Sequence, residues 1–509
     1  MRQIIPFILL LALWSCKRDE PLRPNIIYIM TDDHAYQAIS AYGSEINRTP
    51  NLDRIADKGI IFRNSFVCNS ICAPSRAALL TGKHSHANGH IDNRVRFDSS
   101  QVTFPKLLQQ AGYQTAVIGK WHLKSEPTGF DYWSILPGQG SYYNPDFIEK
   151  DRTYRQTGYA TTIITDKAID WLQQRDTARP FCLLVHHKAP HRNWMPDTID
   201  FGLFDGVDFP IPPNYFDNYD GRQAAALQEM SVIKDMRLSS DLKITGADGD
   251  SLSQPEKDYL WYLDHRMTPE QKKAWLREYD SISKAFLASR PEGDSLAIYK
   301  LNRYLTDYLR TIESVDRNTG RLLDYLESSG LMKNTLVVYT SDQGFYLGEH
   351  GWFDKRFMYE ESFRTPLMMR LPEPLAAHGD ITEMVQNIDF APTFLELAGV
   401  KPPDDMQGIS LVPLLTGRKP GHWRDALYYH YYEFPAEHAV RRHYGIRTER
   451  YKLIHFYNDI DTWELYDLQS DPHEMNNLID DPAYDRIEKH LRKRLAGLRK
   501  EYNVPDEQN

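Results

Sequence analysis

A cysteine, a proline and an arginine stand close together in the stretch Cys72-Ala-Pro-Ser-Arg76, which continues as Ala-Ala-Leu-Leu-Thr-Gly82. Pro74 suits the first turn of a helix because its missing N–H is not needed there, and Gly82 is typical of a helix end. Cys72 is therefore predicted at a helix N-terminus, where backbone N–H groups and the helix dipole attract anions. Arg76 adds a positive charge one turn further along. The arrangement predicts a nucleophile that faces an anionic group.

Oxygen-bearing side chains stand in two pairs, Asp32-Asp33 and Asp342-Gln343, and each pair follows a short apolar run. Carboxylate and amide oxygens are hard ligands that suit Ca²⁺ or Mg²⁺ and suit zinc poorly. An Asp-Asp pair alone is more typical of a turn or a helix cap. The two pairs together with the other motifs predict a site for one divalent cation.

Lysine and histidine side chains follow further apolar runs. Lys120 and His122 stand two positions apart, so on an extended segment they face the same side. His191 and Lys355 end two other polar stretches, Ala-Pro-His and Gly-Trp-Phe-Asp-Lys. Such groups can neutralise an anion and transfer protons. The alternative is that the lysines are exposed loop charges and that His122 belongs to the core. The weaker candidates for the role of His191 are His186 and His187.

The elements that must position these groups share one design, an apolar run that ends abruptly in polar residues. Near-continuous apolar runs of this length are typical of buried parallel strands, and helical patterns separate them. Alternating strands and helices predict an α/β sheet with helices on both faces, and its site lies beyond the carboxyl ends of the strands. The predicted strands are 25–30, 113–118, 181–185 and 335–339, and the predicted helices are 104–111, 162–173 and 301–329.

The stretch around Cys72 resembles the signature of the type I sulfatases, Cys-x-Pro-Ser-Arg followed by Leu-Thr-Gly, at every defining position. In that family the cysteine is oxidised to Cα-formylglycine by a sulfatase-maturating enzyme, and the hydrated aldehyde is the nucleophile. The resemblance extends from about Asn25 to the motifs Tyr451-Lys-Leu-Ile and Glu464-Leu-Tyr-Asp-Leu. It implies an alkaline-phosphatase-like fold: a large mixed sheet flanked by helices, with a smaller C-terminal antiparallel sheet and a helix. The alternative is a chance match, with Cys72 a buried small side chain or an ordinary thiol.

The resemblance also implies roles for the site residues. One Ca²⁺ would be held by five ligands. Lys120 and Lys355 would bind the sulfate, and His122 would act as the base that lets the second hydroxyl expel sulfate. His191 would be the acid for the leaving oxygen, and Arg76 would hold the nucleophile and the carboxylates in place. The implied calcium ligands are Asp32, Asp33, Asp342, Gln343 and the modified Cys72.

Within the family, the stretch from Ser341 to Lys355 looks most like bacterial glycosaminoglycan sulfatases that act on the 6-O-sulfate of N-acetylglucosamine. It implies a 6-O-sulfated glucosamine of heparin or heparan sulfate as the substrate. Candidate sugar contacts are Trp194, His438 and Arg441. The residues expected to form a structural ion-pair element are Glu360, Glu361 and Arg364.

The chain has 509 residues, enough for two domains. A linker-like stretch at 416–421 predicts an N-terminal α/β domain at 17–420 and a C-terminal α+β subdomain at 421–509. The segment from 192 to about 300 reads as an insertion, either a solvated helical excursion or a wall of the substrate pocket. Strands are predicted in the C-terminal part at 426–432, 444–447, 451–456 and 463–466, with a terminal helix at 486–502.

The first 16 residues read as a targeting segment, with Arg2 before an apolar stretch too short to span a bilayer. Its end, Leu13-Trp-Ser-Cys16, resembles a bacterial lipoprotein box, so Cys16 is expected to carry a lipid that anchors an exported protein at the periplasmic or outer surface. The alternative is secretion with cleavage elsewhere. With Cys16 and Cys72 modified, Cys68 and Cys182 remain, and the sequence leaves their pairing open.

The balance of 60 basic and 70 acidic residues gives a net charge of −10, which argues against a nucleic-acid binder. An anionic substrate must then be met by a local cationic pocket. Two other functions stay open from the sequence: a phosphonate monoester or phosphodiester hydrolase that uses the same modified cysteine, and a lipid-anchored glycan-binding protein without activity.

Overall fold

The computed structural model describes residues 23–247, 252–418 and 421–506. Strands from these residues form a ten-stranded mixed sheet with the order β13-β2-β12-β9-β1-β8-β4-β5-β6-β7. Its centre is parallel, and the strands there are almost wholly buried, as the apolar runs predicted. The central strands are β9 (Thr335–Ser341), β1 (Asn25–Thr31), β8 (Phe181–His186), β4 (Gln114–Lys120) and β5 (Tyr132–Leu136).

The margins of the sheet contain the antiparallel pairs. β12 runs antiparallel to β9 and β2, and β6 runs antiparallel to β5 and β7. The prediction of an α/β sheet with helices on both faces is therefore confirmed, with a sheet of mixed direction. The marginal strands are β2 (Ile60–Phe62), β12 (Leu367–Arg370), β13 (Gly379–Ile381), β6 (Asp146–Glu149) and β7 (Arg152–Arg155).

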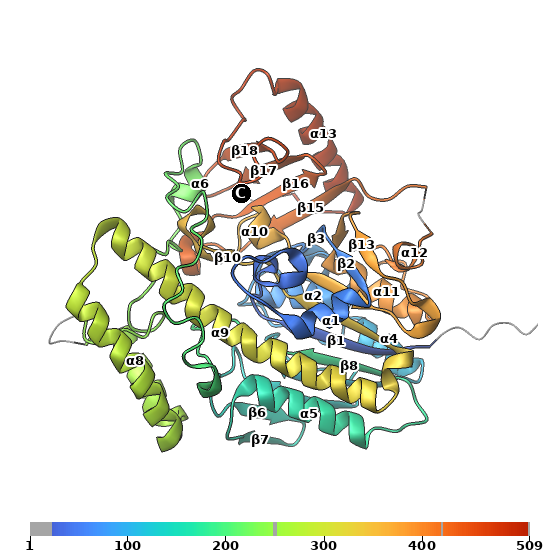
Figure 1. Cartoon of the computed structure of the whole chain (residues 1–509). Helices are drawn as coiled ribbons and strands as arrows, with labels where there is room; N and C mark the ends of the chain where they lie inside the picture. Colours follow the sequence, from blue (N-terminus) through green and yellow to red (C-terminus); the bar gives the residue numbers. More distant parts are fainter. Residues whose placement is uncertain (1–22, 248–251, 419–420, 507–509) are drawn as a thin grey trace, which may run out of the picture.

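Alternate residues of the central strands pack against helices on opposite faces of the sheet. On β1, Ile27 and Ile29 join a core with helices α1, α5 and α9, whereas Ile26 and Tyr28 join a core with α2, α4 and α11. Figure 1 shows α5 and α9 lying across one face of the sheet. The helix bounds are α1 (Pro50–Asp57), α2 (Cys72–Thr81), α4 (Phe104–Gln110), α5 (Ala160–Gln174), α9 (Gly293–Ser328) and α11 (Phe390–Leu397).

The predicted insertion begins as irregular chain and ends in three consecutive helices: α7 (Gln254–Arg266), α8 (Pro269–Ser289) and the first turns of α9. The long helix therefore begins at Gly293, earlier than the predicted Leu301. Tyr259 and Trp275 bury their rings in the same core as α5, and the Trp275 indole donates to the Tyr259 hydroxyl at 2.6 Å. The insertion thus packs onto the large sheet domain and forms part of its core.

The C-terminal part is an antiparallel sheet covered on one face by α13 (Asp485–Glu501), at the top of Figure 1. Leu453 and Leu465 pack against Leu491 and Leu495 of that helix. The opposite face joins the core of the large domain around Trp352. The boundary predicted at 420 falls beside residues outside the described part and stays a prediction. The strands are β15 (Ala426–Tyr431), β16 (His443–Thr448), β17 (Tyr451–Phe456) and β18 (Thr462–Asp467).

Lys452 of β17 connects this sheet to the segment that carries Lys355. Its ammonium is fully buried, 3.0 Å from Glu360 Oε1 and 2.7 Å from Glu474 Oε1. We expect Lys452→Met to destabilise the protein by about 3–5 kcal/mol, because the buried Glu474 carboxylate loses its counter-ion and Glu360 keeps only Arg447. Chemical denaturation measures the change. The control is Lys401→Met, which removes an exposed lysine that pairs with the exposed Asp404. Its expected effect on the free energy of unfolding is under about 1 kcal/mol. Equal changes in the two variants would contradict the prediction.

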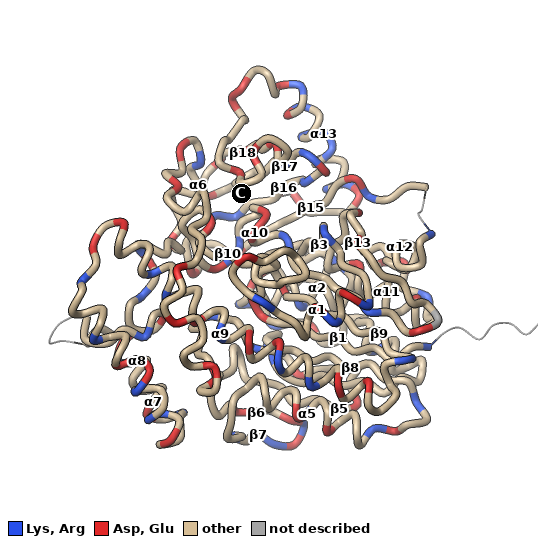
Figure 2. The backbone as a smooth tube through the Cα atoms, viewed as in Figure 1, with Lys and Arg blue, Asp and Glu red and all other residues tan. Residues whose placement is uncertain are grey.

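Acidic and basic positions are interspersed along the chain, as Figure 2 shows, whereas the central strands β1, β8 and β9 carry none. In the part of the chain that the structure describes, no helix combines the length and the apolar character that a membrane crossing requires. The predicted targeting segment at 1–16 lies outside the described residues. Cys68 and Cys182 are both buried free thiols, so they do not pair with each other.

Candidate active site

The predicted site residues meet beyond the carboxyl ends of the central strands. β1 and β9 are paired in parallel with Thr31 opposite Ser341, so the aspartates that follow them start at the same level. The backbone N–H of Asp33 donates to Asp342 Oδ1 at 3.2 Å. Lys120 is the last residue of β4. This confirms the expectation that the parallel strands deliver their polar ends to one edge.

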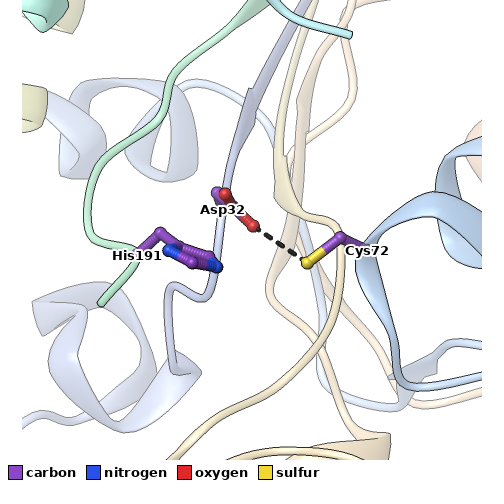
Figure 3. Close-up of side chains that lie close together, drawn as sticks. All are labelled: Asp32, Cys72 and His191. Carbon is purple, nitrogen blue, oxygen red and sulfur yellow. Dashed lines mark hydrogen bonds between the residues drawn. The ribbon is translucent and has the colours of Figure 1, made fainter. Parts of the chain in front are cut away.

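Cys72 is the first residue of α2, and Gly82 ends that helix in the left-handed conformation with φ +65°. Its Sγ lies 3.3 Å from Asp32 Oδ1 and 3.7 Å from Gln343 Nε2, and the residue is 1% exposed. Figure 3 shows Cys72, Asp32 and His191 converging from three different segments. The helix N-terminus predicted from Pro74 and Gly82 therefore points Cys72 into the carboxylate cluster.

Three buried carboxylates, from Asp32, Asp33 and Asp342, lie with an oxygen of each within 4.8 Å of the others. Burial and the neighbouring carboxylates raise the pKa of Asp33 to about 7 and the pKa of Asp342 to about 6. The Gln343 amide donates to Asp33 through Nε2, but its buried Oε1 accepts no hydrogen bond from the described residues. An unused amide oxygen beside three carboxylates is a donor set that fits a hard divalent cation.

Three cationic side chains, those of Lys120, Lys355 and Arg76, face the same carboxylates. Lys355 Nζ lies 2.7 Å from both oxygens of Asp33, and Lys120 forms an ion pair with Asp32. Burial raises the pKa of Asp32, but the attraction of Lys120 and other nearby cations outweighs it and holds this pKa well below its ordinary value. The charges of the cluster therefore compensate one another, and its cations are the groups that could bind an anion.

Arg76 positions two of its neighbours, the carboxylate of Asp342 and the backbone of Lys120, through three hydrogen bonds. Its guanidinium donates to Asp342 Oδ2 at 3.1 Å and 2.8 Å through Nε and Nη2, and to the backbone oxygen of Lys120 at 2.7 Å. The side chain is 2% exposed. A buried, charge-assisted and bidentate contact of this kind fixes the orientation of the carboxylate.

Two imidazoles complete the arrangement. His191 uses Nδ1 to contact its neighbour's backbone oxygen at 2.6 Å and places Nε2 3.9 Å from Asp33 Oδ2. His122 has φ +59°, and burial, followed by the charge of Lys120, lowers its pKa to about 2. Its imidazole is therefore uncharged at neutral pH. His186 instead packs edge-on against Tyr28 on β1, and its Nδ1 contacts a backbone oxygen, so it belongs to the sheet core.

Comparison with known proteins identifies the family. The family model described as Sulfatase matches residues 24–400, well over half of the chain, and the model described as N-sulphoglucosamine sulphohydrolase, C-terminal, matches residues 348–501. The chain belongs to the sulfatase family. A relative named N-acetylglucosamine-6-O-sulfatase, from Bacteroides thetaiotaomicron, is 51% identical over 98% of this chain and 91% of its own length. The protein is therefore a sulfuric ester hydrolase, and the alternative of a non-catalytic glycan binder is not supported.

Solved structures agree with this assignment. One, of a protein in complex with its substrate D-glucosamine-2-N,6-O-disulfate, superposes with a TM-score of 0.91 at 51% identity and covers 96% of this chain and 100% of its own. A phosphonate monoester hydrolase of Agrobacterium radiobacter superposes with a TM-score of 0.67 at 21% identity, with 94% and 96% coverage, which shows a shared fold alone. The alkaline-phosphatase-like fold class predicted for this sulfatase is confirmed.

The three residues expected to contact a sugar lie in different surroundings in the structure. The contact expected for Trp194 is not supported, because its indole lies in the hydrophobic core with its ring centroid 4.6 Å from that of Tyr304. His438 lies near the site, with Nε2 3.3 Å from Asp354 Oδ2, next to Lys355. Arg441 stacks on the Phe434 ring at 4.2 Å. Their contact with a sugar stays a prediction.

The expected ion-pair element is present in a modified form. Glu360 pairs with Lys452 and with Arg447, at 3.0 Å and 3.2 Å. Arg364 instead lies over the Tyr36 ring at 4.5 Å. Glu361 is buried and its Oε2 has no hydrogen-bond partner in the described ranges. Glu360 therefore connects the C-terminal sheet to the segment that follows Lys355.

Two features near the site were missed from the sequence. Asp354 and Arg356 form a buried ion pair on either side of Lys355, and both have positive φ, +78° and +98°. Backbone strain of this kind clusters at functional sites. Lys188 is a third buried lysine, three residues before His191. Its position in the polar stretch after β8 could have indicated from the sequence that Lys188 lies near the site.

Proposed function

We propose that this sulfatase hydrolyses the 6-O-sulfate of glucosamine or N-acetylglucosamine units in heparin and heparan sulfate. The observation that carries the proposal is the 51% identity, over nearly the whole chain, to the relative named N-acetylglucosamine-6-O-sulfatase. The similar protein of known structure was solved with D-glucosamine-2-N,6-O-disulfate, which is sulfated at the same position. The local cationic cluster suits one recognised sulfate, since the protein is acidic overall.

The proposed nucleophile is Cα-formylglycine, made from Cys72 by a sulfatase-maturating enzyme. Burial and the nearby Asp32 carboxylate raise the pKa of the Cys72 thiol far above its ordinary value, so the unmodified side chain stays protonated and is a poor nucleophile. Hydrated formylglycine supplies two hydroxyls on one carbon, one to attack sulfur and one to expel sulfate. The position of Cys72 at the start of α2, against Asp32, supports the proposal.

The proposed metal is a single Ca²⁺ held by the three buried aspartates, Gln343 and residue 72. The support is the donor set, with an unused Gln343 oxygen beside the carboxylates. When bound, the ion polarises a sulfate oxygen and lowers the pKa of the nucleophilic hydroxyl.

The side chains around this centre hold the sulfate and transfer protons. Lys120 and Lys355 neutralise the sulfate oxygens from two sides. His122, neutral because of its burial, takes the proton of the second hydroxyl when sulfate leaves. His191 delivers a proton to the leaving ester oxygen, with Lys355 as a second donor. Arg76 keeps the Asp342 carboxylate fixed throughout.

The proposal includes export and a lipid anchor at Cys16. Its support is the targeting-like sequence of residues 1–16, which ends in Leu-Trp-Ser-Cys. An exported, anchored enzyme suits a bacterium that takes up glycan fragments. Labelling with a radioactive fatty acid, and its loss in Cys16→Ala, tests the anchor.

We expect sulfate release from 6-O-sulfated N-acetylglucosamine to exceed release from 2-O- or 3-O-sulfated glucosamine and from 6-O-sulfated galactose by about 100-fold or more in kcat/KM. The reason is that a site built to bind the hydroxyls around one sulfate leaves buried polar groups unpaired with the wrong isomer. Ion chromatography of released sulfate measures the rates. Preference for another isomer would refute the substrate and leave the sulfatase assignment intact. An aryl phosphodiester, run in parallel, separates this activity from that of a phosphonate or phosphodiester hydrolase.

A further inference from the structure

A pocket of about 280 Å³ lies directly beside the active site, between the loop after β5, the segment after β8 and helix α7 of the insertion. It shares two walls with the site. Gly140 lines the pocket, and the preceding residue, Gln139, contacts Lys120 Nζ with its side chain. Tyr142 lines the pocket and donates its hydroxyl to the His191 backbone oxygen at 2.6 Å. A substrate held at Lys120 and His191 therefore sits against this pocket.

Lys188 is a cation of this pocket that forms no ion pair with a described residue, although the carboxylates of Asp32 and Asp33 attract it over a longer distance. It is 5% exposed, and the structure records no ion pair or hydrogen bond for its ammonium with any described residue. Its Nζ lies over the Tyr142 ring at 4.9 Å. Arg192, in contrast, is bound to Asp241 through two hydrogen bonds of 2.8 Å and 2.7 Å. The side chain is largely buried while the residue lines the pocket, so an ammonium that forms no ion pair can accept an anionic partner there.

The other charges around the pocket do not supply that partner. Asp258 lines it from α7, but it is exposed and accepts a hydrogen bond from Gln254 at 2.7 Å. Arg237 is a further cation at the rim, also exposed. Burial, followed by the repulsion of Lys120, lowers the pKa of Lys188 to about 7, and the attraction of Asp32 and Asp33 offsets only part of this shift. An anion in the pocket would supply the missing compensation and favour the charged lysine.

We propose that the Lys188 pocket binds a second anionic group of the substrate, a sulfo or carboxylate group separate from the sulfate that is hydrolysed. This inference rests on the proposed function. The nitrogen at position 2 and the oxygen at position 6 lie on different sides of a glucosamine ring, so sulfo groups on the two atoms need separate binding sites. The anion has two sources, an N-sulfate on the same sugar or the carboxylate of a neighbouring uronate.

Three substrates distinguish the sources: N-acetylglucosamine 6-O-sulfate, glucosamine-2-N,6-O-disulfate, and a disaccharide in which a uronate is linked to N-acetylglucosamine 6-O-sulfate. We expect Lys188→Met to lower the kcat/KM of one doubly anionic substrate, relative to the N-acetylated monosaccharide, by about tenfold or more, mainly through KM. The substrate affected identifies the source. Lys188→Arg should restore most of the preference. The matched control is Lys257→Met, an exposed lysine of α7, which should keep the wild-type ratios.

Equal losses on all three substrates, or unchanged ratios, would overturn the proposal. If Lys188→Met does not fold, Ser141→Glu places a carboxylate at the pocket wall and should disfavour the same substrate. Saturation-transfer NMR with glucosamine N-sulfate, which lacks the 6-O-sulfate, tests the pocket without turnover, and no binding to the wild type would also overturn it. Failure of the wild type to release sulfate from any of the three would instead refute the proposed function.

Discussion

Replacing Cys72 by alanine should reduce kcat by on the order of 10⁶, because no other side chain of the motif can form an aldehyde and then a diol. Alanine keeps the helix, since it is a strong helix former and the buried position tolerates a small side chain. Sulfate release measures the activity. Peptide mass spectrometry of the active wild type, produced with a maturating enzyme, should show formylglycine at position 72.

The matched control for this prediction is Cys68→Ala. Cys68 is also a buried free thiol, four residues earlier in the chain, and it packs with Ala78 and Ile388 away from the carboxylates. Its replacement should leave turnover within about twofold and leave the modification of Cys72 intact. An active protein that contains only unmodified Cys72 would refute the formylglycine mechanism.

The fold could be predicted from the sequence where the apolar pattern of an element was unambiguous. Strands such as Phe181–His186 are buried on both faces and therefore read as continuous apolar runs, and their order with the helices set the α/β class. The short edge strands, such as β7, are exposed and carry charged residues, so they gave no such signal. The early start of α9 was also hidden, since its first turns are polar and form part of the insertion.

The site could be predicted where chemistry needed unusual residues at strand ends. The aspartates and Lys120 met these conditions, and parallel pairing brought their strands together, whereas Cys72 was found from the pattern of a helix N-terminus. Tertiary contacts decided the rest. Trp194 was expected to contact a sugar because it lies in the predicted insertion, yet it packs against Tyr304 of α9 and Phe353. Lys188 lines a pocket together with α7, which lies some seventy residues further along the chain. The local sequence does not reveal this contact.

Asp342→Asn should lower kcat/KM by about 10³-fold or more and should remove the calcium that we expect elemental analysis to detect in the wild type. The change keeps the volume of the side chain but takes away a charge that serves two partners, the proposed Ca²⁺ and the buried guanidinium of Arg76. Loss of Lewis-acid stabilisation is worth several kcal/mol, about one order of magnitude for each 1.4 kcal/mol. Arg76 left without its partner should also cost about 3–5 kcal/mol of folding stability.

Gln343→Ala separates the two effects of that change. It removes a neutral ligand that has no contact with Arg76 among the described residues, so excess calcium should restore most of its activity, while Asp342→Asn should stay impaired. Asp404→Asn, at an exposed aspartate, should match the wild type in calcium content and rate. Stoichiometric zinc, or full wild-type activity after exhaustive chelation, would rule out the calcium site. Rescue of both variants by calcium would show that Asp342 acts only through the metal, because the orientation of its carboxylate by Arg76 would then be dispensable.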